Sequence, residues 1–437
     1  MVKIAVLVKQ VPSADSRLTL NLQTHTLERS LTDPVLNPSD LHAVEAALRI
    51  AEETSAQTVA AVSMGPEGLE QSTKRALAMG IDESINISDN SLQGADVWMT
   101  ATVLAKAIQT IEADLVFTGS QTTDGNGGVV PAYVAGLLGW NFVEAEDELT
   151  LDSVLNSNKP SVVVIGNKLN SPRLPNFKGI AAAKNKPVTN LDLAQLGLAG
   201  IAPKVQIVEQ STIGRQQKSE KTQGTSPELA QLVLKQIETW SESENTKEPQ
   251  NVFEVAANVE VFEADSKSKA ALCAAEKQAA LITDVVSASE GKFVKEIFDG
   301  QIKVTLQVTG PAVITKAPNP QIKGLAVGVG GGVAAIEDLR EVANRMNAEV
   351  VGTAAAIDKG FIEVGELVGE SGRTISPRIY LSFGVSGAHY HMVGLTKSKY
   401  VIAVNKDPEA EIFQKADLSI VADANEILSE LVKALGK

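Results

Sequence analysis

The sequence contains very little cysteine and few aromatic residues. Its single cysteine, Cys273, excludes disulfides within the chain and any zinc or iron–sulfur site built from several cysteines. A reducing, cytoplasmic location is therefore the expectation. Aromatic residues make up only 4% of the chain, so small aliphatic residues must fill most of the core. That composition favours parallel α/β layers over an aromatic-rich β-sandwich.

A basic surplus and long apolar runs are also missing. The 39 basic residues stand against 53 acidic ones, which gives a formal net charge of −14. Without surplus positive charge to offset phosphates, we expect no nucleic-acid partner. No apolar run approaches the roughly 20 residues of a transmembrane helix, so we expect no membrane insertion. The 437 residues suffice for two to four domains.

Strands and helices alternate through the first part of the chain. Apolar runs predict strands at 2–8, 57–63, 84–88 and 114–118. Helical spacing predicts a helix after Asn37-Pro38-Ser39-Asp40 and further helices at 69–79 and 96–111. Strands separated by such helices imply right-handed crossovers and a parallel sheet. We place this first domain at residues 1–211.

The rest of the chain divides into three segments. Residues 212–251 are polar apart from a helix predicted at 226–240, and are expected to form an arm and linker. Residues 252–320 contain an Ala-rich helix and a strand-like run at 305–315. The alternation returns in residues 321–437, with strands at 349–352, 379–383 and 400–404 and a last helix at 424–435. This last segment predicts a second doubly wound domain.

Glycine-rich loops follow several of the predicted strands. They include 328–332, 369–373 and 386–391 in the last domain, and Gly119–Gly128 in the first. Ligands of open α/β sheets lie beyond the carboxyl ends of the strands, where such loops present N–H groups to phosphate. The loops of the last domain suit a phosphorylated ligand with a polar ring, although each taken alone is equally well read as a turn. For the loop at residues 119–128, we favour a ligand-binding role over a flexible connection between strand and helix.

The sequence offers no catalytic constellation. It contains neither a P-loop nor a GxSxG nucleophile elbow, and no nucleophile is paired with a base. His389 and His391 alternate, so an extended segment would not direct both to one metal. Cys273 lies in an Ala-rich helix, where packing is the expected role. We therefore predict no catalytic residues and no metal site.

These loops and their surroundings resemble the electron transfer flavoproteins. The stretch from Val350 to Asp423, above all NKDPEAEIFQKAD, is similar to the flavin-binding domain of the α subunit. Residues 282–315 resemble the end of that subunit's first domain. The pieces VLVKQVP, LNPSDLHAVEAALRI, SMGPEG, KRALAMGID, GSQTTDGNGG and SPRLPNFKGIAAAKNKP resemble the β subunit. The chain thus looks like a fusion of a β-like half and a shortened α-like half.

The resemblance implies a fold and a function. It implies an α/β fold with doubly wound parallel sheets, an adenine nucleotide alpha-hydrolase-like N-terminal domain, and a Rossmann-like/DHS-like FAD-binding C-terminal domain. It also implies an electron carrier with FAD rather than an enzyme with its own substrate. Such a carrier accepts electrons from a flavoprotein dehydrogenase, through the segment around Phe177, and passes them to a quinone reductase or another acceptor.

Family residues carried over by the resemblance give two sets of site residues. For FAD they are Gly331, Thr353, Val368, Gly369, Glu370, Ser371, Ser386, Gly387, Ala388, His389, Tyr390, His391, Asn405 and Asp423. For AMP, which the family's β part usually holds, they are Leu7, Asn37, Pro38, Ser39, Asp40, Met64, Ser120, Gln121, Thr122, Thr123, Asp124, Gly125, Asn126, Gly127, Gly128, Val129, Val130 and Pro131.

The resemblance also assigns roles. Ser371 is expected to donate a hydrogen bond to a flavin ring nitrogen. His391 is expected to bond or charge-stabilise the pyrimidine edge of the flavin in its anionic reduced forms. Ser386 suits the pyrophosphate, and Asn405 and Asp423 the adenosine end.

The sequence departs from the family pattern in two respects. Ala354 and Gly331 replace arginines, which should lower the flavin potential or weaken binding unless His389 and Arg373 compensate. The α-like part is also short, since only about 60 residues precede residue 310 where the family has a full domain. Either another chain, as in a homo-oligomer, supplies the missing surface, or the β-like domain stands largely alone.

Two alternative functions remain open at this point. One is a nucleotide-binding regulatory or scaffold protein that keeps the fold without redox activity, which the missing arginines would allow. The other is an electron-bifurcating flavoprotein that uses NADH, because TTDGNGG has some similarity to the corresponding loop of that group.

Overall fold

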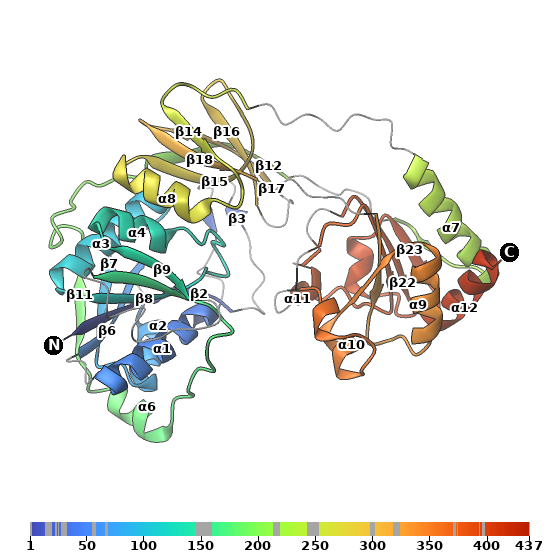
Figure 1. The fold of residues 1–437 in the computed structure, drawn as a ribbon, viewed down its shortest axis with the longest axis horizontal. Coiled ribbons are helices and arrows are strands. Elements are labelled where there is room, and N and C mark those ends of the chain that lie inside the picture. Colours follow the sequence, from blue (N-terminus) through green and yellow to red (C-terminus); the bar gives the residue numbers. More distant parts are fainter. Residues whose placement is uncertain are drawn as a thin grey trace. The chain divides into compact units, whose positions relative to one another are not determined.

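The computed structural model divides into two compact units (Figure 1). The first contains residues 1–210, 252–295 and 304–318, and the second contains residues 211–251, 296–303 and 319–437. The residues that the structure describes are 2–13, 20–21, 24, 26–27, 33–54, 58–65, 69–145, 160–212, 219–242, 253–297, 302–317, 324–369, 373, 375–392, 394–395 and 398–436.

A seven-stranded parallel sheet forms the centre of the first unit. Its order is β11-β7-β6-β1-β8-β10-β9. The strands are β1 (Lys3–Leu7), β6 (Thr58–Gly65), β7 (Glu83–Ser88), β8 (Leu115–Gly119), β9 (Asn141–Ala145), β10 (Ser161–Ile165) and β11 (Val188–Leu191). The central strands are buried, as apolar strands covered on both faces should be. The chain order reverses between the neighbours β1 and β8, which makes their carboxyl ends the topological switch point.

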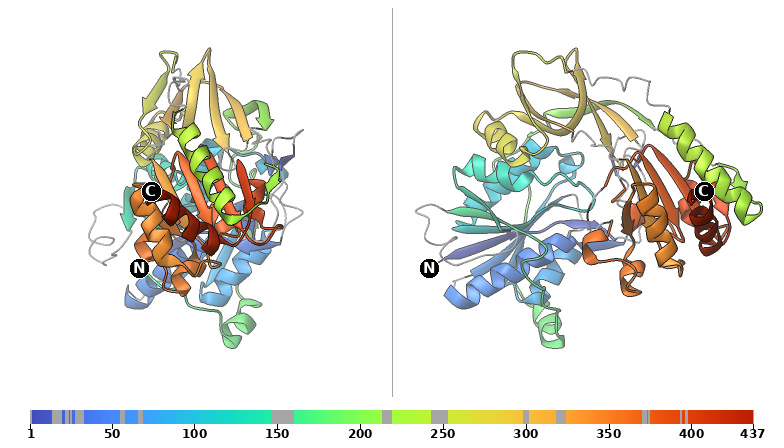
Figure 2. Two further views of the ribbon diagram at one scale, coloured as in Figure 1. Left: turned by 90° about the vertical axis from the view of Figure 1, so that its right-hand side faces the viewer. Right: turned by 45° about the vertical axis from the view of Figure 1, so that its right-hand side comes forward.

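Helices cover both faces of this sheet (Figure 1 and Figure 2, right). On one face lie α1 (Pro38–Thr54), α2 (Glu70–Met79) and α6 (Phe177–Ala183); on the other lie α3 (Val97–Thr110) and α4 (Val130–Leu138). Alternate residues of β1 enter the two cores: Ile4 and Val6 face α1, while Ala5 and Leu7 face α3 and α4. Short elements complete this part: β2 (Gln10–Pro12), β3 (Leu20–Asn21), β4 (Thr26–Leu27), β5 (Pro34–Leu36) and a 3-10 helix at Asn90–Leu92.

The middle segment adds a mixed six-stranded sheet to the first unit. Its order is β12-β17-β16-β15-β18-β14. The strands are β12 (Val205–Thr212), β14 (Val259–Phe262), β15 (Ala280–Ser289), β16 (Lys292–Ile297), β17 (Ile302–Val308) and β18 (Ala312–Lys316). The helix α8 (Lys267–Glu276) packs between this sheet and α4. The contact is tight, because a Cβ on Gly136 would lie 2.5 Å from that of Ala275.

A six-stranded parallel sheet forms the second unit. Its order is β13-β23-β22-β21-β19-β20. The strands are β13 (Lys221–Thr222), β19 (Leu325–Val329), β20 (Glu349–Gly352), β21 (Ile379–Phe383), β22 (Tyr400–Asn405) and β23 (Leu418–Val421). The helices are α7 (Ser226–Glu242), α9 (Ile336–Arg345), α10 (Ala354–Asp358), α11 (His389–Met392) and α12 (Ala424–Leu435), with 3-10 helices at Val364–Glu366 and Glu411–Gln414. One core cluster joins one face of the sheet to α7, α9 and α12.

The predicted α/β class with doubly wound parallel sheets is confirmed. The strand-like run at 305–315 is in fact two strands, because Gly310 turns the chain with a φ of +88° between β17 and β18. The four segments proposed from sequence stay a prediction as domains; in the structure, most of 252–320 groups with residues 1–210, and the arm at 212–251 groups with the C-terminal part. Among the described residues, no helix is both long and apolar enough to cross a membrane.

Candidate functional site

The carboxyl ends of the parallel strands in the second unit carry most of the predicted FAD residues. Gly331 follows β19, Thr353 follows β20, Ser386 to His391 follow β21, Asn405 ends β22, and Asp423 follows β23. The chain order reverses at β19 and β21, which are neighbours in the sheet. The sheet therefore brings these residues to one edge, at the switch point where ligands of such folds bind.

At the switch point, the loops after β19 and β21 touch through their backbones. The Gly330 N–H donates to the Phe383 carbonyl at 2.9 Å. A Cβ on Gly330 would lie 2.1 Å from the Gly384 carbonyl oxygen, so only glycine fits there. Gly384 itself has a φ of +60°. The close approach explains the glycines at both positions in terms of backbone geometry.

The loop after β21 is held by further contacts. The Ile412 N–H donates to the Ser386 carbonyl at 2.9 Å. A Cβ on Gly387 would come within 2.2 Å of the Ile412 nitrogen. Asn405 donates from Nδ2 to the Val385 carbonyl at 2.9 Å, and its Oδ1 accepts the Asp407 N–H. Asn405 is thus buried and fixes the loop, whereas Ser386 and Ala388 remain exposed.

Thr353 presents a buried hydroxyl at the same edge. Its backbone N–H donates to the Val329 carbonyl at 3.1 Å, next to the Gly330 loop. Its Oγ1 is buried but has no hydrogen-bond partner in the described part of the chain. Buried hydroxyls are normally hydrogen-bonded, so this one fits a polar ligand atom. The glycine loops and this hydroxyl are consistent with a phosphorylated ligand such as FAD.

Val368 and His391 lie next to this edge and are joined by a hydrogen bond. The Val368 N–H donates to the Gly352 carbonyl at 3.0 Å, and the Val368 carbonyl lies 2.9 Å from Nδ1 of His391. Nε2 of His391 is 2.8 Å from the Tyr380 hydroxyl. Burial lowers the pKa of His391, which favours a neutral ring. Direct bonding of His391 to a flavin stays a prediction.

Asp423 caps α12 at the far end of the edge. Its Oδ1 accepts the Asn425 N–H at 2.8 Å, and Asn425 in turn accepts N–H groups of Ala334 and Ala335. Asp423 therefore helps to fix the segment that leads into α9. The side chains of His389 and Tyr390, and all of Glu370 and Ser371, lie outside the described residues.

The structure shows the partners of three cations in the second unit. Arg373 forms an ion pair with Glu349 at 2.5 Å, and Arg340 forms one with Glu366 at 3.0 Å. Lys359, which follows α10, donates from Nζ to the Gly331 carbonyl at 2.5 Å. Lys359 thus puts positive charge beside a position where the family has arginine. Sequence reasoning missed it, because Lys359 lies 28 residues from Gly331 in the sequence and only the fold brings the two together.

The predicted AMP residues of the first unit also converge on a switch point, at the carboxyl ends of β1, β6 and β8. Asn37, Ser39 and Asp40 are buried there. Asn37 donates from Nδ2 to the Gln121 carbonyl at 2.9 Å. Ser39 accepts the Ser120 N–H at 3.0 Å and donates to Asn167 at 2.9 Å. These side chains hold the loop after β8 in position; Asn167 was not predicted.

Asp40 is a buried carboxyl under this loop. It accepts the Lys9 N–H at 2.8 Å and an Asn37 Nδ2–H at 2.9 Å. Burial raises its pKa to about 7, although these hydrogen bonds and the Lys9 charge oppose the shift. A Cβ on Gly119 would come within 2.5 Å of Asp40 Oδ1, so the carboxyl packs directly against the backbone of β8.

The loop residues themselves remain partly open to solvent. Gln121, Thr123, Gly125, Asn126 and Gly128 are exposed. Asn126 and Gly128 have φ values of +48° and +65°, which turn the backbone just before α4. Lys9 Nζ forms an ion pair with Asp124 at 2.7 Å. Lys9 was missed from sequence, although it is the first charged residue after β1.

Residues Arg173 to Ala183 form an anchored segment with an apolar surface. Leu174, Phe177 and Ile180 are 81%, 88% and 50% exposed, respectively. Arg173 anchors the segment through ion pairs to Glu45 at 2.8 Å and Glu52 at 2.7 Å. We call residues 173–183 the partner segment. Its structure presents large apolar side chains to solvent on a fixed support.

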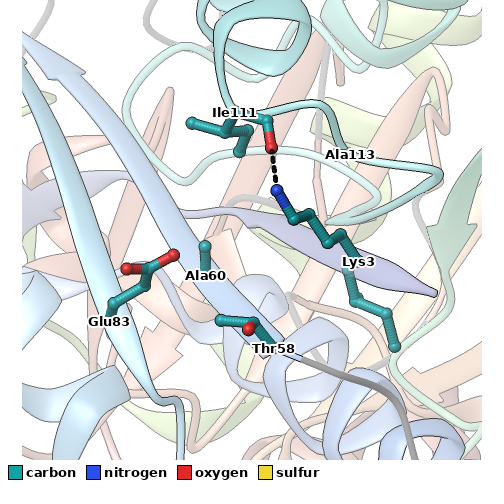
Figure 3. A pocket seen from close by; sticks show the side chains of 7 residues that line it. Lys3, Thr58, Ala60, Glu83, Ile111 and Ala113 are labelled. Carbon is teal, nitrogen blue, oxygen red and sulfur yellow. Dashed lines mark hydrogen bonds between the residues drawn. The ribbon is translucent and has the colours of Figure 1, made fainter. Parts of the chain in front are cut away.

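A small pocket of the first unit lies at the opposite edge of the seven-stranded sheet (Figure 3). Its lining residues come mainly from the amino ends of the strands: Lys3, Ile4, Thr58, Ala60, Glu83, Ile111 and Ala113. Figure 3 shows the Lys3 side chain directed at the Ile111 carbonyl, 3.5 Å away. Its place at the amino ends separates it from the predicted nucleotide loops.

The N-terminal part of the chain matches known proteins. Residues 24–196 match the electron transfer flavoprotein domain model. An electron transfer flavoprotein subunit beta from Mycobacterium leprae is 39% identical over 221 residues, which cover 45% of this chain and 82% of that protein. The subunit beta from Thermoanaerobacterium thermosaccharolyticum is 33% identical over 256 residues, covering 54% of this chain and 97% of that protein.

The C-terminal part matches the partner subunit of the same family. Residues 323–396 match the electron transfer flavoprotein FAD-binding domain model. A mitochondrial electron transfer flavoprotein subunit alpha from Oryza sativa subsp. indica is 47% identical over 97 residues, or 22% of this chain and 27% of that protein. No finding favours the scaffold or the NADH-using alternative. This chain belongs to the electron transfer flavoprotein family, as a β-like part fused to an α-like FAD-binding domain with electron transfer as its function.

Proposed function

We propose that FAD lies along the carboxyl edge of the β13-β23-β22-β21-β19-β20 sheet. The observation that carries this proposal is the convergence of five strand ends on one edge, with the Gly330–Gly384 contact at the switch point. When bound, FAD supplies the redox chemistry by taking up and releasing electrons. The exposed residues Ser386 and Ala388 suit the pyrophosphate, and the buried Thr353 hydroxyl suits a polar atom of the cofactor.

A visible spectrum of the purified protein tests this placement together with one variant. We expect flavin absorption bands in the wild type and their loss on Thr353→Val, which removes the buried hydroxyl while keeping the shape of the side chain. Ser219→Ala, which changes a hydroxyl bonded to Ser419 elsewhere in this unit, serves as the control and should keep its flavin. A protein that stays colourless after incubation with FAD would refute the proposal.

We also propose AMP as the ligand of the first unit. The support is the exposed loop 121–128, its turns with positive φ, and the start of α4, a nine-residue helix whose first N–H groups have no side-chain cap. Asn37 and Ser39 bond to the loop after β8, and Asp40 bonds to Asn37. Their role in the proposal is positioning, and the loop backbone would contact the phosphate.

Replacing Gly127 with aspartate should weaken AMP binding at least about tenfold, because a carboxylate in the loop repels the phosphate. Gly127 tolerates a side chain, since the atoms nearest to its Cβ position lie 3.9 Å and 4.0 Å away. Gly127→Asn, of the same size but neutral, is the matched control. Calorimetry with AMP gives the affinities, and equal affinities for the two variants would contradict a phosphate at this loop.

We propose that a flavoprotein dehydrogenase docks on the partner segment, residues 173–183, and passes its electrons to this protein. The support is the exposure of Leu174, Phe177 and Ile180 on a segment anchored by Arg173. A quinone reductase or another acceptor would then take the electrons. We further propose a cytoplasmic location, because a single cysteine fits a reducing compartment. We also propose that the chain forms a homo-oligomer.

Phe177→Ala should raise the KM for this protein about tenfold in a dehydrogenase-coupled reduction assay, because interface aromatics carry much of the binding energy. The flavin spectrum and kcat should not change, since Phe177 is 88% exposed. Val188→Ala, at an apolar residue 46% exposed in β11 of the same unit, is the control. If both variants behave like the wild type, the dehydrogenase docks elsewhere.

A further inference from the structure

A buried tyrosine reaches from the middle of the sheet to the predicted FAD edge. Tyr380 is the second residue of β21 and is 0% exposed. Its ring extends along the sheet over Gly328, where a Cβ would lie 2.0 Å from the Tyr380 hydroxyl oxygen. The hydroxyl ends 2.8 Å from Nε2 of His391. Glycine at position 328 thus makes room for this hydroxyl.

The two contacts of His391 determine where its proton lies. Nδ1 is 2.9 Å from the Val368 carbonyl, which can only accept a hydrogen bond. Nδ1 must therefore carry the hydrogen. A neutral imidazole has one N–H, so Nε2 has a lone pair and accepts from the Tyr380 hydroxyl. Burial of the ring, which is 5% exposed, agrees with the neutral form.

This chain of hydrogen bonds joins segments on the two sides of β19. His391 follows β21, and Val368 is bonded to Gly352 at the end of β20. The strands β21 and β20 flank β19 in the sheet. Val368 is thus held through its N–H on one side and its carbonyl on the other. The segment Val368–Gly369 is part of the predicted FAD site, so its position depends on these bonds.

We propose that Tyr380 is a positioning residue for the FAD site: its hydroxyl holds His391 in the Nδ1–H tautomer, and His391 in turn fixes Val368. The role of Tyr380 toward FAD depends on the FAD placement proposed above, whereas the tautomer of His391 does not depend on it. In this arrangement both ring nitrogens of His391 are engaged by the protein. Tyr380 and His391 therefore act as one hydrogen-bonded unit.

Nitrogen-15 NMR of the histidine rings tests the tautomer directly. The chain has four histidines, so His391 can be assigned from a His391→Phe sample. We expect a protonated Nδ1 and an unprotonated, hydrogen-bonded Nε2, with the Nε2 resonance shifting in Tyr380→Phe. Tyr400→Phe is the matched control, since Tyr400 stacks on Trp240 in the same unit, with ring centroids 4.3 Å apart. A protonated Nε2 in the wild type would overturn the assignment.

A double-mutant cycle tests the positioning role. Tyr380→Phe and His391→Phe should each raise the FAD dissociation constant about tenfold, and the double variant no more than either alone. Additive effects would mean that the two residues act separately. Weaker binding in His391→Phe with unchanged binding in Tyr380→Phe would mean that His391 contacts the flavin itself. If the wild type binds no FAD, the FAD placement fails while the NMR result still decides the tautomer.

Discussion

Gly330→Ala should yield a protein without bound flavin and with a second unit destabilised by about 3 kcal/mol, the upper part of the range for overpacked sites. The added methyl carbon would lie 2.1 Å from the Gly384 carbonyl oxygen and 2.6 Å from Val385 Cα. These are backbone atoms, so no rotamer change relieves the overlap. The loops after β19 and β21 would have to separate at the point where the FAD site is proposed.

Flavin content per protein and thermal unfolding measure the two effects. Gly365→Ala is the matched control, because no atom lies within 4 Å of its Cβ position and its φ is not positive. This control should keep its flavin and its stability, or gain slightly from the lower entropy of its unfolded chain. A flavin-replete, stable Gly330→Ala protein would show that the two loops do not need their close contact.

Arg173→Gln should destabilise the first unit by about 3 kcal/mol and weaken dehydrogenase docking. Glu45 is 3% exposed, and Arg173 donates to its carboxylate through both the backbone N–H and Nε. Without the guanidinium, a buried carboxylate keeps only Arg49 as a cationic partner. The partner segment also loses its guanidinium bonds to Glu45 and Glu52 of α1 and keeps only the backbone bond to Glu45, so the support under Phe177 is weakened. Denaturant unfolding and the coupled reduction assay check the two results.

The loss of stability in Arg173→Gln should depend on pH. Burial by itself would raise the pKa of Glu45, but hydrogen bonds from Arg173 and Arg49 outweigh it and hold the pKa below its usual value. A lowered pKa contributes stability above the unfolded-state value, and this contribution is lost as the pH falls through the folded-state value. The difference between wild type and variant should therefore be largest near neutral pH and shrink below about pH 4.

Glu112→Gln is the control for this charge change. Glu112 pairs with Lys3 at 3.7 Å in the same unit, and its side chain is 84% exposed. Exposed pairs contribute about 0–1 kcal/mol, so this variant should unfold almost like the wild type. If Glu112→Gln lost as much stability as Arg173→Gln, the burial of Glu45 would not explain the importance of its pair with Arg173.

Sequence patterns predicted the parallel sheets well, because buried parallel strands are short apolar runs bounded by helices. They failed in the middle segment. The strand β16 reads KFVKEI, in which charged residues alternate with apolar ones, and β15 is interrupted at Asp284, where φ is +59°. Irregular strands in a mixed sheet do not give the continuous apolar signal of β8 or β10.

The structure brings several of the predicted site residues together, while their roles stay predictions. Asn37, Ser39 and Asp40 were predicted to bind AMP together with the loop after β8; their burial, and the bonds of Asn37 and Ser39 to that loop, appear only in three dimensions. The sequence also gave no reason to connect Tyr380 with His391, because a tyrosine in an apolar strand looks like any other core residue. Such contacts depend on how strands and loops meet.

The interleaved composition of the two units has a consequence for biosynthesis. The first unit draws on residues 1–210, 252–295 and 304–318, while the second draws on 211–251 as well as 319–437. The α8 helix packs against α4, and the Tyr133 hydroxyl donates to the Ala274 and Ala279 carbonyls at 3.1 Å and 2.7 Å. Domains generally fold as they leave the ribosome, the N-terminal one first. Here the first unit stays incomplete until residue 318 has emerged from the ribosome. The arm at 211–251 is synthesised before then, but β23, the strand that pairs with its β13, follows only later.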